Sequence, residues 1–143
     1  MAQGGTYLTF DGSGHPRFER SLPLDVSALP AARHQLRVFL RGLHLERGVV
    51  DSILLCVQEA CKNAVRFSGS SKGIDVCVTL EEGVVSAVVR DYGGGFDVTR
   101  QTNEAPDPFR ESGRGLFLIH ALMDRVEILE STGTEVRMCK ALA

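Results

Sequence analysis

The sequence lacks the segments that carry a protein into or across a membrane. Its 143 residues contain no apolar run close to the roughly 20 residues that a membrane-spanning helix needs. The first residues, MAQGGTYLTFDGSGHP, have neither a cationic start nor an apolar block, so we expect no secretory signal peptide. A net charge of −2 gives no general attraction to nucleic acid or to an anionic membrane surface. We therefore expect a cytoplasmic protein that binds neither of them directly.

Cysteine is scarce, and its spacing fits no metal or disulfide pattern. The four cysteines are Cys56, Cys61, Cys77 and Cys139, and no two of them form a C-x-x-C pair. Cys56 and Cys61 lie five residues apart in a segment with helical periodicity, which separates them by about 140° around the helix axis. This spacing speaks against a zinc site and against a disulfide framework. We expect free thiols in a reducing compartment.

Two common phosphate-binding motifs are also absent. The chain contains no G-x-x-x-x-G-K-[ST] sequence, which defines a P-loop. It contains no G-x-G-x-x-G sequence, which defines the dinucleotide-binding turn of Rossmann folds. A nucleotide site in this chain would have to use other residues.

What is present fits a single globular domain. A content of 43% hydrophobic and 24% charged residues is ordinary for a soluble domain, and the chain is long enough to bury a sizeable core. Residues 1–16 are rich in glycine and polar side chains. We therefore expect a loose N-terminal segment over residues 1–16 and one domain over residues 17–143.

Hydrophobic periodicity predicts three helices and five strands in this domain. A polar loop with two prolines, residues 97–112, is long for a compact domain and is expected to be functional. In chain order we expect a strand at 17–24, helices at 26–43 and 46–67, strands at 74–81 and 84–91, a helix at 115–125, and strands at 126–131 and 134–141.

The strand expected at 74–81 indicates the fold class. Its side chains alternate, so that one face is apolar while the other is polar or small. The apolar row consists of Ile74, Val76, Val78 and Leu80. Such a strand has one buried and one wet face, whereas strands of a doubly wound parallel sheet are apolar on both. We therefore expect an α+β two-layer sandwich, with helices on one face of a mainly antiparallel sheet.

Three polar residues share one face of the helix expected at 46–67. Glu59 and Asn63 are four residues apart, and Arg66 lies within about 60° of both around the axis. An asparagine oxygen can ligate Mg²⁺, and a neighbouring glutamate could polarise a hydroxyl that attacks a phosphate. Such spacings are common by chance, so an inert polar helix face is the alternative.

Asp91 ends the strand at 84–91 in an unusual position. Strand parity places it in the same row as Val85, Ala87 and Val89. A carboxylate facing the helix layer is costly unless a donor hydrogen-bonds to it, and the exocyclic amine of adenine is such a donor. An aspartate that only caps the following turn is the alternative.

Glycines follow that aspartate and recur before the last helix. Gly93 and Gly95 allow the backbone to approach a ligand closely. Gly113 and Gly115 stand at the expected start of the third helix, where unpaired N–H groups attract phosphate and Arg114 adds positive charge. Flexible turns would explain each glycine pair alone. The combination of the glycines with Asp91 and Asn63 indicates a nucleotide site.

Taken in order, these blocks resemble the serine-protein kinase anti-sigma factors, which belong with histidine-kinase catalytic domains to the GHKL (Bergerat-fold) ATPases. The segment 59–66 is similar to the family's N box, 91–97 to its adenine-binding turn, and 113–116 to its phosphate-side glycine turn. Gly133 and Thr134 resemble the pair on the last strand whose threonine sits near the adenine-bound aspartate.

The resemblance implies a role for each of these residues. Glu59 would be the general base and Asn63 the ligand of Mg²⁺, with Arg66 at the phosphates. Asp91 would bind the adenine amine of ATP, close to Thr134. The remaining nucleotide contacts would come from Gly93, Gly95, Gly113, Arg114, Gly115 and Leu116.

The implied function is that of an anti-sigma regulatory factor with protein kinase activity. Such a protein binds a sigma factor and uses Mg·ATP to phosphorylate a serine or threonine of an anti-sigma-factor antagonist; the family likeness also implies a homodimer. Two alternatives stay open: a non-catalytic ATP-binding module that regulates a partner, and a catalytic fragment of a histidine kinase. The histidine-kinase alternative fits less well, because only about 45 residues precede the helix at 46–67, too few for the usual phosphoacceptor helical hairpin. Phe67 departs from the family pattern, since relatives often carry histidine there.

Overall fold

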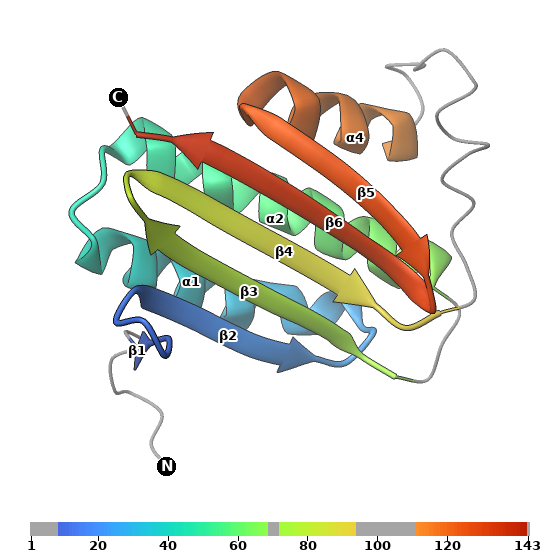
Figure 1. Ribbon diagram of the computed structural model, residues 1–143. Helices are drawn as coiled ribbons and strands as arrows, with labels where there is room; N and C mark the ends of the chain where they lie inside the picture. Colours follow the sequence, from blue (N-terminus) through green and yellow to red (C-terminus); the bar gives the residue numbers. More distant parts are fainter. Residues whose placement is uncertain (1–8, 69–71, 94–110, 143) are drawn as a thin grey trace.

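Figure 1 shows a sheet with helices behind it, in a computed structural model that describes residues 9–68, 72–93 and 111–142. The described strands are β1 (Thr9–Phe10), β2 (Pro16–Leu22), β3 (Ile74–Glu81), β4 (Val84–Asp91), β5 (Arg125–Ser131) and β6 (Gly133–Ala141). The described helices are α1 (Leu29–Gly42), which follows the short 3-10 helix η1 (Val26–Ala28), α2 (Arg47–Phe67) and α4 (Glu111–Leu122). The predicted α+β two-layer sandwich is confirmed.

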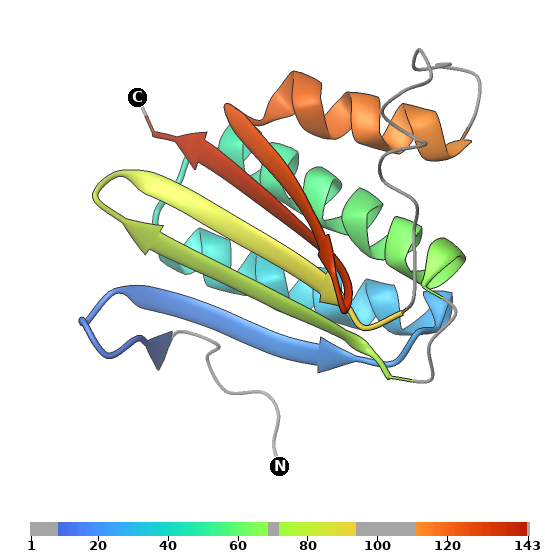
Figure 2. The same ribbon diagram turned by 45° about the vertical axis from the view of Figure 1, so that its right-hand side comes forward.

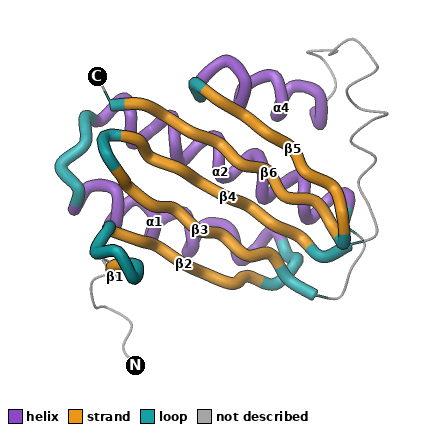
Figure 3. The backbone as a smooth tube through the Cα atoms, in the orientation of Figure 1, coloured by secondary structure: helices purple, strands orange, loops and turns teal. Residues whose placement is uncertain are grey.

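The sheet is antiparallel throughout its described strands. Its order is β1-β2-β3-β4-β6-β5, so the hairpins β3–β4 and β5–β6 meet where β4 pairs with β6 (Figure 3). The register sets Arg90 opposite Glu135. The end of β4 therefore lies beside the start of β6, which brings Asp91 next to Thr134 although they are 43 residues apart in the sequence.

The helices cover one face of the sheet, and α2 lies between α1 and α4 (Figures 1 and 2). Because of this position, α2 buries its two flanks as well as the side that faces the sheet. Cys56 shows the consequence: it follows the same side of the helix as the polar residues Ser52, Glu59 and Asn63, yet it is fully buried. Val65, near the end of the helix, is only half-buried. The buried residues of α2 are Val50, Ile53, Leu54, Cys56, Val57, Ala60, Cys61 and Ala64.

The strand rows and the first helix contribute the rest of the core as predicted. In β4 the row that ends with Asp91 is buried, and in β3 the apolar row is buried except for the half-buried Leu80. The ring of Phe18 on β2 lies 5.7 Å from that of Phe39 on α1, measured between centroids. The buried residues of α1 are Leu29, Leu36, Phe39 and Leu40.

Most predicted boundaries agree with the structure to within two residues, but α4 differs. It begins at residue 111 rather than 115 and ends at residue 122 rather than 125. The chain leaves the helix early because Asp124 already donates its backbone N–H to the Cys139 carbonyl on β6. Within the segment expected to be loose, residues 9 and 10 form β1, which pairs with β2. The division of the chain into residues 1–16 and 17–143 stays a prediction.

The structure also bears on the expectations about thiols and membranes. All four cysteines are free. Burial raises the pKa of the Cys56 thiol to about 11 and that of Cys61 to about 12, so both stay protonated at neutral pH. Among the described residues, no helix combines the length and the apolar character needed to cross a membrane.

We predict that Leu40→Ala destabilises the protein strongly. Leu40 lies on the buried face of α1 and is fully buried, so its truncation leaves a cavity. The free energy of unfolding should therefore fall by about 2–5 kcal/mol in urea titrations. Val38→Ala on the same helix is the matched control, because Val38 is 40% exposed and its truncation should change stability by about 0.5 kcal/mol at most. Equal losses in the two variants would contradict the assignment of the buried face of α1.

Candidate functional site

Asp91 is a buried carboxylate at the last residue of β4. It is 4% exposed. Two backbone N–H groups donate to the same oxygen, Oδ1: that of Gly93 at 3.0 Å and that of Thr134 at 3.3 Å. No hydrogen bond to the other oxygen, Oδ2, is found among the described residues. One oxygen therefore holds the turn in place, while the other is available to a donor on a ligand.

The turn between β5 and β6 holds Thr134 against Asp91. Gly133 has a φ of +123°, and a Cβ on it would lie 2.1 Å from the Asp91 carbonyl oxygen, so this position requires glycine. Thr134 is 5% exposed, and its Oγ1 has no hydrogen-bond partner among the described residues. The site thus contains a buried hydroxyl in need of a partner, directly beside the aspartate.

A small pocket lies beside these two residues, between α2, α4 and the sheet. Its polar lining consists of Asn63, Asp91 and Thr134. Apolar walls with a few convergent polar groups are typical of small-molecule sites. The apolar lining consists of Ala60 and Ala64 on α2, Leu116 on α4, and Val89, Ile128 and Val136 on the sheet.

Glu59 and Asn63 of α2 meet Gly115 of α4. A Cβ on Gly115 would lie 2.8 Å from Glu59 Oε1 and 3.8 Å from Asn63 Nδ2. The other carboxylate oxygen of Glu59, Oε2, forms an ion pair with Lys62 Nζ at 3.4 Å. Because residue 115 has no side chain, α4 can approach these two polar side chains closely. The structure therefore brings segments 59–66 and 113–116 into contact.

The predicted start of the last helix, at residue 115, is wrong. Helix α4 already begins at Glu111, so Gly113, Arg114 and Gly115 are helical. The N–H groups without a helical partner include that of Gly113 but not that of Gly115, which lies one turn in. Glycine at position 115 allows helices to pack closely, and this role looks the same in sequence as a flexible turn.

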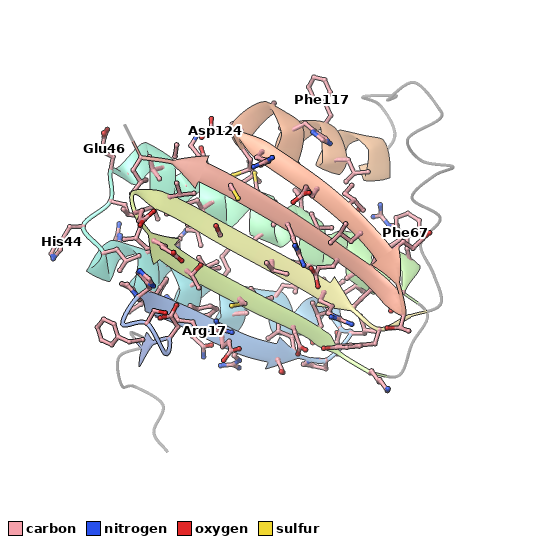
Figure 4. The ribbon with its side chains drawn as sticks, in the orientation of Figure 1. Arg17, His44, Glu46, Phe67, Phe117 and Asp124 are labelled. Atoms are coloured by element: carbon pink, nitrogen blue, oxygen red, sulfur yellow. The ribbon has the colours of Figure 1, made fainter. Side chains whose placement is uncertain are left out.

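Several predicted contacts are not placed in the pocket. Arg66 stands on the last turn of α2, where its guanidinium lies 5.9 Å from the centre of the Phe67 ring, and it does not line the pocket. Figure 4 shows Phe67 at the end of α2 opposite Glu46. Gly95 and the predicted loop up to residue 110 lie outside the described residues, as does the side chain of Arg114.

Sequence reasoning missed Ser68, which directly follows α2. It is 4% exposed, and its Oγ has no hydrogen-bond partner among the described residues. A Cβ on Gly93 would lie 2.4 Å from this Oγ, so the serine packs against the turn that holds Asp91. In the sequence it is only the first residue of the helix-ending run 68–71, and no spacing rule singles it out.

These residues fit an adenine nucleotide bound with Mg²⁺. The exocyclic amine of adenine can donate to Asp91 Oδ2, and a flat base suits a pocket walled by small side chains. Among the described residues, no group of three or more His, Cys, Asp and Glu side chains could hold a metal ion by itself. Mg²⁺ needs few protein ligands when phosphate and water complete its octahedron, and Asn63 offers one neutral oxygen at the pocket wall.

Comparison with known families defines the class of protein. The histidine kinase-like ATPase domain family matches residues 22–140, which is most of the chain. The chain therefore belongs to the family of histidine kinase-like ATPase domains.

Similar proteins narrow the class within this family. Serine-protein kinase RsbW of Bacillus pumilus (strain SAFR-032) is 29% identical over 138 residues, a match that covers 85% of this chain and 85% of that protein. Serine-protein kinase RsbW of Staphylococcus aureus (strain MRSA252) is 30% identical over 121 residues and is matched over 76% of its length. The resemblance to the serine-protein kinase anti-sigma factors is confirmed, and with it the class of protein serine kinase.

Solved structures agree with the fold. The RsbU and RsbW domains of Rv1364c from Mycobacterium tuberculosis match with a TM-score of 0.70 and 25% identity, over 89% of this chain and 32% of that one. This chain thus spans about a third of that protein. The SiaB–SiaC complex from Pseudomonas aeruginosa matches with a TM-score of 0.64 over 85% of this chain, and at 13% identity it supports the fold alone.

We predict that Asp91→Asn abolishes most nucleotide binding without unfolding the turn. The asparagine oxygen can keep both backbone N–H donors, but its NH₂ group then faces the exocyclic amine of adenine, so two donors oppose each other. The affinity for ADP, measured by calorimetry, should fall about 100-fold, as expected for loss of a hydrogen bond to a charged group combined with an unpaired buried donor.

Asp51→Asn is the matched control for this variant. Asp51 is an exposed residue of α2 and does not line the pocket, so ADP affinity should stay unchanged. Wild-type affinity in Asp91→Asn would remove Asp91 from the nucleotide site.

Proposed function

We propose that this protein binds and blocks a sigma factor and uses Mg·ATP to phosphorylate a serine or threonine of the anti-sigma-factor antagonist. Similarity to proteins named serine-protein kinases supports the reaction. The sigma factor, the antagonist, a homodimeric state and a cytoplasmic location enter the proposal through the family likeness.

One observation carries the nucleotide part of the proposal: backbone N–H groups bind only one of the two Asp91 carboxylate oxygens among the described residues. Oδ1 is committed to the N–H groups of Gly93 and Thr134, and Oδ2 has no partner among the described residues. Asp91 lines the pocket, so a ligand bound there can donate a hydrogen bond to this second oxygen. The adjoining pocket, with Asn63 in its wall, is the place where that ligand would bind.

The family resemblance supplies the roles of the other residues. When bound, ATP would supply the phosphoryl group, and the accompanying Mg²⁺ would neutralise developing negative charge. Asn63 would hold the metal through its side-chain oxygen. Glu59, whose side chain is 16% exposed and is oriented by Lys62, accepts the proton of the attacking hydroxyl. Arg66 and the N–H groups of the first turn of α4 stabilise charge on the phosphates.

Incubation with γ-labelled ATP and candidate antagonist proteins tests the proposal. Label that appears on a serine or threonine of one antagonist supports the kinase reaction. Nucleotide that binds with no transfer to any candidate favours a non-catalytic module, in which ATP only adjusts the affinity for a partner.

We predict that Glu59→Gln separates binding from catalysis. The amide keeps the size of the side chain and its place against Gly115 but accepts no proton, so the phosphotransfer rate should fall by about 100-fold or more. The affinity for ADP should remain within a factor of about two, because Glu59 does not line the pocket beside Asp91.

Glu127→Gln on β5 is the matched control, since Glu127 is exposed and pairs in register with Arg137 on the sheet. It should keep wild-type transfer and binding. A wild-type transfer rate in Glu59→Gln would show that another group accepts the proton.

A further inference from the structure

Ser68 carries a buried hydroxyl whose hydrogen bonds are unaccounted for. The residue is 4% exposed, and its Oγ has no partner among the described residues. Its backbone N–H donates to the Ala64 carbonyl at 2.9 Å, so the end of α2 is already held without the side chain. Buried polar groups in proteins nearly always have a hydrogen-bond partner. A hydroxyl that the fold does not use is therefore a candidate for contact with a ligand.

This hydroxyl lies against the turn that holds Asp91, although Ser68 is not among the residues that line the pocket. Ser68 packs on Gly93, since a Cβ there would lie 1.9 Å from the Ser68 carbonyl oxygen and 2.4 Å from its Oγ. The N–H of the same Gly93 donates to Asp91 Oδ1. Ser68 therefore packs on the residue whose N–H holds the carboxylate that the base would meet.

A second unpartnered hydroxyl lies next to the same aspartate. Thr134 Oγ1 is buried and has no partner among the described residues, and the Thr134 N–H donates to Asp91 Oδ1. The end of α2 and the start of β6 therefore each bring a free hydroxyl to the Asp91 turn. A hydroxyl both donates and accepts, which suits the edge of a purine, where ring nitrogens accept and an amine donates.

The position of Ser68 along α2 separates it from the reacting groups. It follows Glu59 by nine residues, which corresponds to about 14 Å along a helix axis. Glu59 is the residue that meets Gly115 of α4. A contact made by Ser68 should therefore concern the base, whereas the phosphates belong near Glu59 and Asn63.

We propose that Ser68 is a specificity-determining residue that hydrogen-bonds the adenine base, directly or through one water, beside Asp91. The inference rests on the proposed function, because it assumes that an adenine nucleotide occupies the pocket. It adds a contact that neither the sequence motifs nor the family resemblance supplies. The contact is with the base, so it acts equally on every ligand that carries adenine.

Ser68→Ala tests this inference through binding, catalysis and stability together. The dissociation constants for ADP and for adenosine should both rise by the same factor, about 5- to 10-fold, as expected for one neutral hydrogen bond. The phosphotransfer rate at saturating ATP should stay unchanged, because the contact is the same in the ground state and in the transition state. The melting temperature without ligand should stay the same or rise, because the variant removes a buried hydroxyl that has no partner.

Ser86→Ala is the matched control. Ser86 lies on β4 with its Oγ 3.6 Å from Cys139 Sγ, away from the pocket lining, so both dissociation constants should remain at the wild-type value. Wild-type affinities in Ser68→Ala would overturn the inference, and so would a loss restricted to ADP, which would place the contact at the phosphates. A lower melting temperature with unchanged affinities would assign the hydroxyl to the fold and overturn it as well.

The wild-type protein separates a failure of this inference from a failure of the proposed function. Wild-type protein that binds neither ADP nor adenosine would overturn both. Wild-type protein that binds ADP while Ser68→Ala binds it equally well would overturn only the role of Ser68.

Discussion

Two backbone N–H groups hold one oxygen of a buried carboxylate, and the rest of the site depends on this contact. One donor, Gly93, follows directly after β4, and the other, Thr134, lies on β6, which pairs with β4. A shift of the β4–β6 register by one residue would turn Asp91 or Thr134 to the other face of the sheet. The antiparallel pairing therefore both builds the sheet and aims the carboxylate at the pocket.

The helix layer adds the second constraint, which is the position of α2 between α1 and α4 (Figure 1). Burial on both flanks holds α2 firmly, and Gly115 lets α4 approach Glu59 and Asn63 without a side chain in between. The pocket is therefore formed by elements far apart in the sequence: the end of α2, the body of α4 and the ends of two paired strands. Each supplies one or two side chains, and none supplies a complete site.

Sequence reasoning succeeded where the signal is local. The bounds of β3 and β4 and the inward row ending at Asp91 follow from period-two alternation, and the structure agrees with both. It failed where the signal is a contact between elements. The start of α4 was hidden by glycines that resemble a turn, because glycine at a close helix contact and glycine in a loop look alike in sequence. The burial of Cys56 does not follow from the sequence pattern, because the burial of a second flank depends on the neighbouring helix.

The sequence by itself determined the elements, the fold class and the candidate residues Glu59, Asn63 and Asp91, since periodicity and residue chemistry act over a few neighbouring positions. Only the tertiary structure decided which oxygen of Asp91 the N–H groups of Gly93 and Thr134 hold and which helix meets Glu59. It alone also revealed that the hydroxyls of Ser68 and Thr134 have no hydrogen-bond partner among the described residues. The physical reason is that hydrogen-bond partnership and burial depend on groups that folding brings together from distant parts of the chain.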